Sequence, residues 1–307
     1  DRNINAAAFA LFWRAWGSGG YYHLGQRHAI MKGVFYEAGW RYNRKIRALE
    51  LSTARVGPDN VRLFRDLILK YKPRFMRGYP SSMYLFSRLL REQQLDLHIP
   101  MIITGSETLY DFQRKEIEDV LGARVYNHYT HWERCASVLE CDAGRMHAQL
   151  DYGYHEILGD DGQPVPPNVN GVVTVTTMHN LAMPFIRYRT GDIASWSAEH
   201  CECGQSFPVI NRIEGRQTDY LIAAEGELVS GTFAAAALWP LPHLMYSQIV
   251  QRELGKIEVR IVKGAGYQEP ESTTLVLDAL KARVGPGLKI DLKFCGLEDL
   301  ERNSVGK

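Results

Sequence analysis

The sequence predicts an α/β fold, in which a parallel sheet with helices is joined to an antiparallel β region and followed by a small mobile α+β C-terminal domain. Between residues 59 and 129, strand-like segments alternate with helical segments of roughly a dozen residues, which is the pattern of βαβ units. From residue 142 to 214, short strand-like segments are separated by turns such as Asp160-Asp161-Gly162, as in antiparallel sheets. A strand–helix–strand pattern then closes the chain.

The N-terminal part predicts two helices around one strand. Helical periodicity covers Asn5–Trp16 and Tyr36–Leu49, and a strand is expected at Ala29–Val34. The apolar run Ala6–Trp13 could imitate a signal peptide, but Arg14 closes it early and no convincing small-residue cleavage site follows. We therefore expect a buried helix there.

The middle of the chain predicts a regular alternation of helices and strands. Asp59–Tyr71 is amphipathic, and Pro58 before it is typical of a helix start. The other elements expected here are a strand at Arg74–Tyr79, a helix at Ser81–Gln94 capped by Ser81 or Ser82, a strand at Met101–Thr104, a helix at Tyr110–Leu121 ending at Gly122, and a strand at Val125–Tyr129.

The last part predicts short strands and then a separate small domain. The short strands are expected at His147–Gln149, Tyr154–Leu158, Gly171–Thr177 and Phe185–Tyr188. A boundary at Gly215–Asp219 divides a domain of residues 1–218 from one of residues 219–307. The elements expected in the smaller domain are strands at Tyr246–Arg252 and Lys256–Val262, a helix at Ser272–Val284 and a strand at Lys289–Phe294.

The composition excludes several classes of protein. With 36 Lys and Arg against 35 Asp and Glu, the net charge of +1 gives no reason to expect nucleic acid or a membrane surface as partner. No apolar run approaches the roughly 20 residues that span a membrane. Five cysteines at irregular spacing are not typical of a secreted disulfide framework, so a reducing, cytoplasmic location is expected.

Three segments carry residues suited to ligand chemistry. Tyr126–Cys141 follows a predicted strand, and ligands of open α/β sheets collect at that end of the strands. Tyr188–Asp192 and Gly215–Asp219 each place a carboxylate near a glycine, where its two oxygens can accept from a vicinal diol. The arginine in each offers a donor fork for phosphate or carboxylate. Taken alone, each segment is typical of a surface turn; their order makes them more specific.

A set of soft ligands predicts a metal site. Cys141, His147, Cys201 and Cys203 supply four ligands, which is the number that a closed structural Zn²⁺ site needs. The alternative is four unrelated residues with reduced thiols. The remaining cysteines are expected to be buried apolar residues.

The ordered segments YRTGD (Tyr188–Asp192), GRQTD (Gly215–Asp219) and the terminal SVGK resemble the motif set of the acyl-adenylate-forming enzymes. The likeness is strongest to the phenylacetate–CoA ligase-like family, especially its capsular-polysaccharide-biosynthesis branch, and it covers roughly residues 60 to 307. Segments that add to it are RGYPSS (Arg77–Ser82), TGSE (Thr104–Glu107), YTHWER (Tyr129–Arg134) and CECG (Cys201–Gly204).

The resemblance implies ATP-dependent activation of a carboxylic acid to an acyl-adenylate with release of pyrophosphate, then transfer to a thiol, with coenzyme A expected. Residues 1–218 would be the C-terminal part of the large adenylate-forming domain, and residues 219–307 a small domain that carries the catalytic lysine. ATP, Mg²⁺ and coenzyme A are implied, and the resemblance supports the structural zinc. A small carboxylic acid is the expected partner, and a homodimer is left open.

The resemblance also implies roles for individual residues. The nucleotide would be bound by Asp192 at the ribose hydroxyls, by Tyr129 at the adenine, by Gly105, Ser106 and Glu107 lining the adenine and acyl pocket, and by Thr130 and Arg216 nearby. Catalysis would depend on Lys307, between the carboxylate and the α-phosphate, and on Glu133, which would bind Mg²⁺. Asp219 would be the hinge about which the small domain rotates.

The chain departs from the family pattern in two ways. Thr130 stands where the family has a glycine, and Trp132 where it has serine or threonine. No phosphate loop of the TSGTTG kind is found, and the chain starts at Asp1, so we expect a fragment whose missing front portion carries that loop. The alternative is a remnant that does not bind ATP productively.

Other readings compete with the ligase. They are a non-catalytic nucleotide- or partner-binding module of the same fold and a zinc-dependent hydrolase, against which the closed ligand set argues. Two histidines that flank Tyr129, His128 and His131, would either line the acyl pocket or be packed or solvent-facing.

Overall fold

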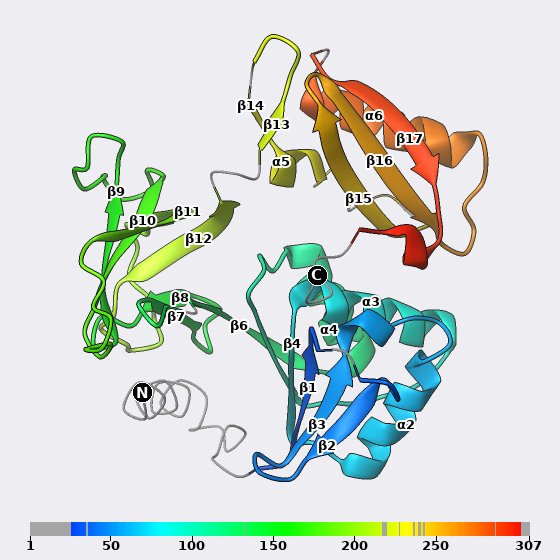
Figure 1. Ribbon diagram of the computed structural model, residues 1–307, viewed down its shortest axis with the longest axis horizontal. Coiled ribbons are helices and arrows are strands. Elements are labelled where there is room, and N and C mark those ends of the chain that lie inside the picture. Colours follow the sequence, from blue (N-terminus) through cyan, green and yellow to red (C-terminus); the bar gives the residue numbers. More distant parts are fainter. Residues whose placement is uncertain are drawn as a thin grey trace. The chain divides into compact units, whose positions relative to one another are not determined.

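The computed structural model of the 307-residue chain describes residues 26–34, 36–131, 133–216, 220–226, 228–235, 237–238, 241, 243–285 and 287–301 (Figure 1). The chain folds as two compact units, the first of which ends at Arg216. This division falls within the boundary expected at Gly215–Asp219. The roles assigned to residues 1–218 and 219–307 stay predictions.

One sheet runs through the first unit and changes character halfway. Its strands are β1 (His28–Lys32), β2 (Trp40–Asn43), β3 (Ala48–Ser52), β4 (Phe75–Gly78), β5 (Met101–Gly105), β6 (Arg124–Thr130), β7 (Ser137–Glu140), β8 (Met146–Ala148), β9 (Gly153–Leu158), β10 (Gly171–Thr177), β11 (Tyr188–Trp196) and β12 (Val209–Arg216). Their spatial order is β2-β3-β1-β4-β5-β6-β7-β8-β12-β11-β10-β9. Neighbours from β3 to β6 are parallel, and neighbours from β6 to β9 are antiparallel, which confirms the predicted fold class.

Helices α2 (Val61–Tyr71), α3 (Pro80–Glu92) and α4 (Asp111–Leu121) accompany the parallel strands (Figure 1). Each buries an apolar face, as the sequence predicts; in α2 the buried residues are Val61, Phe64 and Ile68. α4 ends where Gly122 takes a left-handed conformation, which confirms the predicted stop. Among the residues that the structure describes, no helix is long and apolar enough to cross a membrane.

The helix predicted at Tyr36–Leu49 is wrong, because this segment forms β2 and the start of β3. Gly39 and Arg47 have positive φ angles of 77° and 50°, which a right-handed helix does not contain. β3 lies between β1 and β2 and is buried along its whole length, including the polar residues Glu50 and Ser52. A short 3-10 turn, Thr53–Arg55, follows it.

The start of α3 also differs from the prediction. The helix begins at Pro80 with Tyr79 before it, so neither Ser81 nor Ser82 is its cap. The backbone N–H of Ser81 instead donates to Glu107 Oε2 at 3.0 Å. A carboxylate from the loop after β5 therefore takes the place of the local cap.

The second unit is a small α+β domain. It contains a two-stranded sheet of β13 (Tyr220–Ile222) and β14 (Leu228–Ser230), a three-stranded sheet of β15 (Leu244–Glu253), β16 (Lys256–Lys263) and β17 (Lys289–Phe294), helices α5 (Gly231–Ala235) and α6 (Glu271–Val284), and a 3-10 turn at Leu297–Asp299. β16 and β17 pair in parallel with α6 between them in the chain, which confirms the predicted β-α-β pattern. Ile257, Val259 and Val276 lie at the centre of its core.

Glu50, on β3, is a fully buried carboxylate surrounded by donors. It accepts from the Tyr36 hydroxyl at 2.5 Å, Arg41 Nε at 2.6 Å and Asn43 Nδ2 at 3.0 Å, and Lys32 Nζ lies 2.8 Å away. Burial alone would raise the pKa of Glu50, but these donors stabilise its charged form and lower the pKa to about 2. The edge formed by β1, β3 and β2 therefore depends on an ionised carboxylate.

We expect Glu50→Gln to lower the free energy of unfolding of the first unit by about 3 kcal/mol at neutral pH, because the amide leaves Lys32 and Arg41 without their buried anion. The difference in free energy of unfolding between wild type and Glu50→Gln should be complete above about pH 4.3, the pKa of a glutamate in the unfolded chain. It should fade as the pH falls toward about 2, because the pKa of Glu50 is lower in the folded protein. Urea unfolding across that pH range measures it. Glu37→Gln, at an exposed position, is the control. If Glu50→Gln lost the same free energy of unfolding at about pH 2 as at neutral pH, the role of the ionised Glu50 would be contradicted.

Candidate functional site

The YRTGD segment lies inside a strand. β11 begins at Tyr188 and runs through the whole segment, so the strand predicted at Phe185–Tyr188, with a glycine turn after it, is wrong. The glycine is needed for a different reason: Gly191 has a φ of 80° in the middle of the strand.

A bulge in β11 determines where Asp192 points. Val172 of β10 pairs with Ile193 of β11, and Thr174 pairs with Arg189. Two positions along β10 therefore correspond to four positions along β11. The extra residues around Gly191 bend the strand, and a bulge of this kind re-aims the side chains that it contains. Across the other edge, Asp192 pairs with Arg216 of β12.

The bulge brings Asp192 to Tyr129, near the end of β6. The Tyr129 hydroxyl donates to Asp192 Oδ2 at 2.7 Å. Burial and the charge of Asp192 raise the pKa of Tyr129, so the hydroxyl keeps its proton and acts as a donor. The residues predicted for the ribose and the adenine, which lie 63 positions apart in the chain, are thus joined directly.

Glu133 lies beside this pair. Its Oε1 accepts from the Tyr188 hydroxyl at 3.3 Å, and its backbone carbonyl accepts from Asn180 Nδ2 at 3.2 Å. Its side chain is 36% exposed, so the carboxylate is held by the protein and still reaches solvent. A carboxylate in this state is suited to bind a hard cation such as Mg²⁺.

The loop after β5 makes contacts that the sequence did not predict. Gly105 lies against His128, so a Cβ at this position would be 2.5 Å from His128 Cε1 and 2.8 Å from its carbonyl oxygen. Ser106 has a φ of 67° and is exposed. Glu107 accepts from the first turn of α3, as described above. The predicted roles of these residues toward the adenine and the acyl group stay predictions.

His128 is packed against the end of β5. Its Nδ1 lies 2.8 Å from the carbonyl oxygen of Thr104. Burial, with a smaller effect from Arg77, lowers the pKa of His128 to about 4, so the ring is neutral near pH 7. Of the two alternatives for His128, packing has the direct support of these contacts.

Other predicted site residues lie at the ends of strands or outside the described part of the chain. Thr130 ends β6 and pairs with Ser137 of β7, while Arg216 ends β12. The predicted residues outside the described part of the chain are Lys307, Asp219 and Trp132.

Sequence reasoning missed the parts played by His131 and Tyr188. His131 Nε2 lies 2.5 Å from the Tyr129 hydroxyl and 3.1 Å from Asp192 Oδ2. Tyr188 was part of a motif but had no role of its own. The available signal for His131 was its spacing, because residues two positions apart in an extended chain lie on one side of it.

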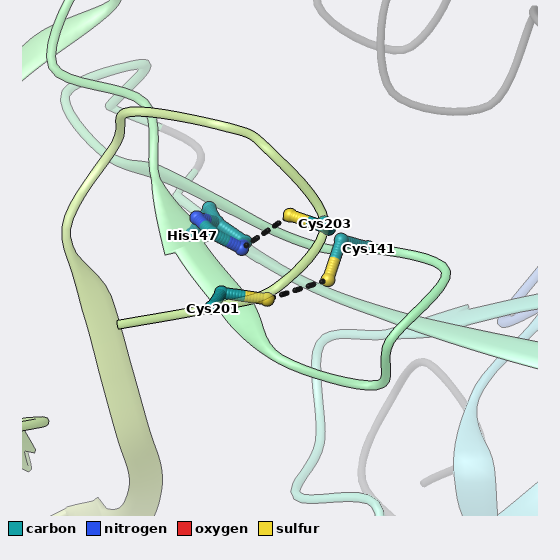
Figure 2. Close-up of side chains that lie close together, drawn as sticks. All are labelled: Cys141, His147, Cys201 and Cys203. Carbon is teal, nitrogen blue, oxygen red and sulfur yellow. Dashed lines mark hydrogen bonds between the residues drawn. The ribbon is translucent and has the colours of Figure 1, made fainter. Parts of the chain in front are cut away.

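The predicted metal ligands come together from three places in the sheet (Figure 2). Cys141 follows β7, His147 lies on β8, and Cys201 and Cys203 lie in the loop between β11 and β12. The four ligand atoms lie within 4.8 Å of one another. Cys141 Sγ is 3.7 Å from Cys201 Sγ, and Cys203 Sγ is 3.3 Å from His147 Nε2.

The distance between Cys141 Sγ and Cys201 Sγ fits a tetrahedral zinc ion, and the distance between Cys203 Sγ and His147 Nε2 is slightly shorter than such a site requires. With Zn–S and Zn–N bonds of about 2.3 and 2.0 Å, the ligand atoms of such a site are about 3.5 to 3.8 Å apart. His147 Nδ1 lies 2.8 Å from the carbonyl oxygen of Phe207. That carbonyl accepts a hydrogen bond from a protonated Nδ1, which leaves Nε2 unprotonated toward the thiols, as a metal-binding histidine requires. The predicted ligand set is therefore brought together in a suitable geometry.

Comparisons with known proteins point to one group of relatives. Residues 221–307 match the family model described as the CapK C-terminal domain. Protein CapK of Staphylococcus aureus is 26% identical over 259 residues, which cover 83% of this chain and 54% of that protein. A phenylacetate-coenzyme A ligase of Thermus thermophilus is 29% identical over 201 residues, which cover 62% of this chain and 45% of that protein. The chain thus spans about half the length of these relatives.

Solved structures share the fold. A 2-hydroxyisobutyryl-CoA ligase in the postadenylation state has a TM-score of 0.74 at 20% identity, covering 98% of this chain and 68% of that chain. A benzoate CoA ligase from Burkholderia xenovorans has a TM-score of 0.65 at 14% identity, covering 98% and 64%. At these identities the likeness shows the fold.

We expect Gly105→Ala to lower the free energy of unfolding of the first unit by about 1–3 kcal/mol, because the added Cβ meets the backbone of His128 and cannot be relieved by a rotamer change. Gly57→Ala is a matched control, since a Cβ there meets nothing within 4 Å. Urea unfolding of both variants measures the difference. Equal stabilities would show that the loop after β5 shifts freely.

Proposed function

This chain belongs to the phenylacetate–CoA ligase-like family, on the branch of CapK, and from that premise we propose that the protein activates a carboxylic acid with ATP. In the first half-reaction a carboxylate oxygen attacks the α-phosphorus, the bond to pyrophosphate breaks, and an acyl-adenylate forms. In the second, a thiol attacks the acyl carbon and AMP leaves. We propose coenzyme A as that thiol.

The observation that carries this proposal is the contact between Tyr129 and Asp192. The family resemblance assigns both residues to one nucleotide, and the first unit joins them by a hydrogen bond of 2.7 Å. Asp192 would accept from the ribose hydroxyls, because a carboxylate has acceptor sites for both. Tyr129 would contact the adenine with its ring while its hydroxyl holds Asp192.

Glu133 is the residue that we propose for Mg²⁺. It lies four positions after Tyr129 and its exposed carboxylate is oriented by the Tyr188 hydroxyl. Mg²⁺, when bound, would neutralise charge that builds up on the triphosphate. The protein's own part is to hold this carboxylate close to the residues that bind the nucleoside, so that metal and nucleotide are positioned together.

We propose that the small unit serves both half-reactions by rotating between them. Asp219 would be its hinge, and in the first half-reaction Lys307 would stabilise the charge between carboxylate and α-phosphate. The division of the chain after Arg216, next to Asp219, supports a hinge at this place. A structure of 2-hydroxyisobutyryl-CoA ligase that resembles this chain, with a TM-score of 0.59, contains 2-HIB-AMP and CoA, which supports coenzyme A as the acceptor.

We also propose that Cys141, His147, Cys201 and Cys203 bind a structural zinc ion. Four protein ligands fill a tetrahedral site and leave no position for a substrate, so the ion would have no catalytic role. It would tie the hairpin of β7 and β8 to the loop before β12.

The proposed activity is tested by exchange of labelled pyrophosphate into ATP. We expect exchange by the natural protein to require a carboxylic acid and to fall about 10²- to 10³-fold in Glu133→Gln and in Lys307→Ala, because each removes a group that stabilises developing charge. Glu118→Gln is the control, since its side chain is 35% exposed and lies outside the site.

A failure of the natural protein to catalyse exchange with a broad panel of acids would contradict the ligase. If it still bound ATP, the non-catalytic nucleotide-binding module would be favoured.

The zinc proposal has its own test. We expect about one zinc ion per chain in the purified protein and a large loss of stability in Cys201→Ser, because binding of a structural zinc can contribute on the order of 10 kcal/mol to folding. Cys295→Ser, at a cysteine outside the cluster, should keep the metal and the stability. Metal analysis and thermal unfolding measure both. No metal, together with wild-type stability of Cys201→Ser, would end the proposal.

A further inference from the structure

The imidazole of His131 lies between the residues proposed for the ribose, the adenine and the metal. Its Nε2 is 2.5 Å from the Tyr129 hydroxyl and 3.1 Å from Asp192 Oδ2, and its Nδ1 is 3.8 Å from Glu133 Oε2. The rings of His131 and Tyr129 meet edge-on, with centroids 4.8 Å apart. Their contact is therefore apolar as well as polar.

These contacts are removed from solvent. The side chains of His131 and Asp192 are only 7% and 9% exposed. A hydrogen bond to a buried carboxylate is stronger than one at the surface, and its loss leaves an acceptor that water does not reach easily. The orientation of Asp192 is thus sensitive to the donor beside it.

The contacts determine which nitrogen of His131 carries a proton. The Tyr129 hydroxyl has one proton, with which it donates a hydrogen bond to Asp192 Oδ2. His131 Nε2 then faces two acceptors, the phenolic oxygen and the carboxylate oxygen. Nε2 must therefore be protonated and donate, because an unprotonated nitrogen would place a lone pair against both. Tyr129 and His131 together hold Asp192 Oδ2 in one position.

We propose that His131 is a positioning residue for the nucleotide ribose: it donates from Nε2 to the Tyr129–Asp192 pair and so fixes the carboxylate that recognises the ribose hydroxyls. The inference rests on the proposed function for the identity of the ligand at Asp192. It assigns to His131 neither contact with the acyl group nor proton transfer. The resulting selectivity is for a nucleotide with a complete ribose.

The test compares binding of AMP with binding of 3′-deoxy-AMP to the natural protein by titration calorimetry. Wild type should prefer AMP by about tenfold or more, the value of a hydrogen bond to a charged acceptor. His131→Leu should reduce that preference to about threefold or less, because Asp192 loses its orientation. His131→Gln, whose side-chain amide can donate from a position close to Nε2, should restore most of it.

Matched variants separate positioning from general damage. His98→Leu, at an exposed histidine outside the site, should leave the preference unchanged. Asp192→Asn should abolish it, and adding His131→Leu to Asp192→Asn should have no further effect, because both act on one carboxylate. If His131→Leu fails to fold in a thermal unfolding test, His131→Met carries the same measurement.

The outcomes distinguish this inference from the proposed activity. A folded His131→Leu with the wild-type preference would overturn the inference, and so would equal binding of AMP and 3′-deoxy-AMP by wild type. A wild type that shows the expected preference and its loss, but no pyrophosphate exchange, would overturn the ligase activity and leave the role of His131 standing.

Discussion

Strand β6 pairs in parallel with β5 along one edge and antiparallel with β7 along the other, and the candidate site depends on this double pairing. In open parallel sheets, ligands bind at the carboxyl ends of the strands. After β6 the chain reverses direction between Thr130 and Ser137 instead of crossing over through a helix. The antiparallel strands therefore begin beside the carboxyl end of β6. Tyr129 and Glu133 therefore lie where the two kinds of sheet meet, within reach of β11.

The antiparallel half must hold β11 in register for Asp192 to reach that place. Its bulge and Gly191 supply the local bend near the start of the strand. Beyond the other end of β11, Cys201 and Cys203 meet Cys141 and His147. A metal bound there would fix the positions of the neighbouring strands β7, β8 and β12 in the sheet, since the ligands lie on these strands or in the loops next to them. The proposed zinc site and the proposed nucleotide site are thus linked through the same strands.

Two buried carboxylates in the first unit are stabilised in different ways. Glu50 lies among Lys32, Arg41, Tyr36 and Asn43, which compensate its charge so fully that its pKa falls to about 2. Such a group holds the strands of its donors together. Asp192 Oδ2 lies within hydrogen-bonding distance of a hydroxyl and an imidazole. Donors of this kind orient the carboxylate without the charge pairing found at Glu50, which suits a residue that is proposed to bind hydroxyl groups.

The sequence by itself determined the order of helices and strands wherever apolar periodicity is regular, as in α2 and β16, because local burial patterns decide those elements. It also identified the Cys and His set, since ligand type and number are properties of residues. Only the tertiary structure decided β2 and β3, where the pairing of β2 with β3 and of β3 with β1 overrides helical periodicity, and the start of α3, where Glu107 arrives from a distant loop. The joining of Tyr129, His131 and Asp192 is of the same kind. A bulge and the pairing of strands far apart in the chain place side chains within hydrogen-bonding distance, and no local pattern encodes that distance.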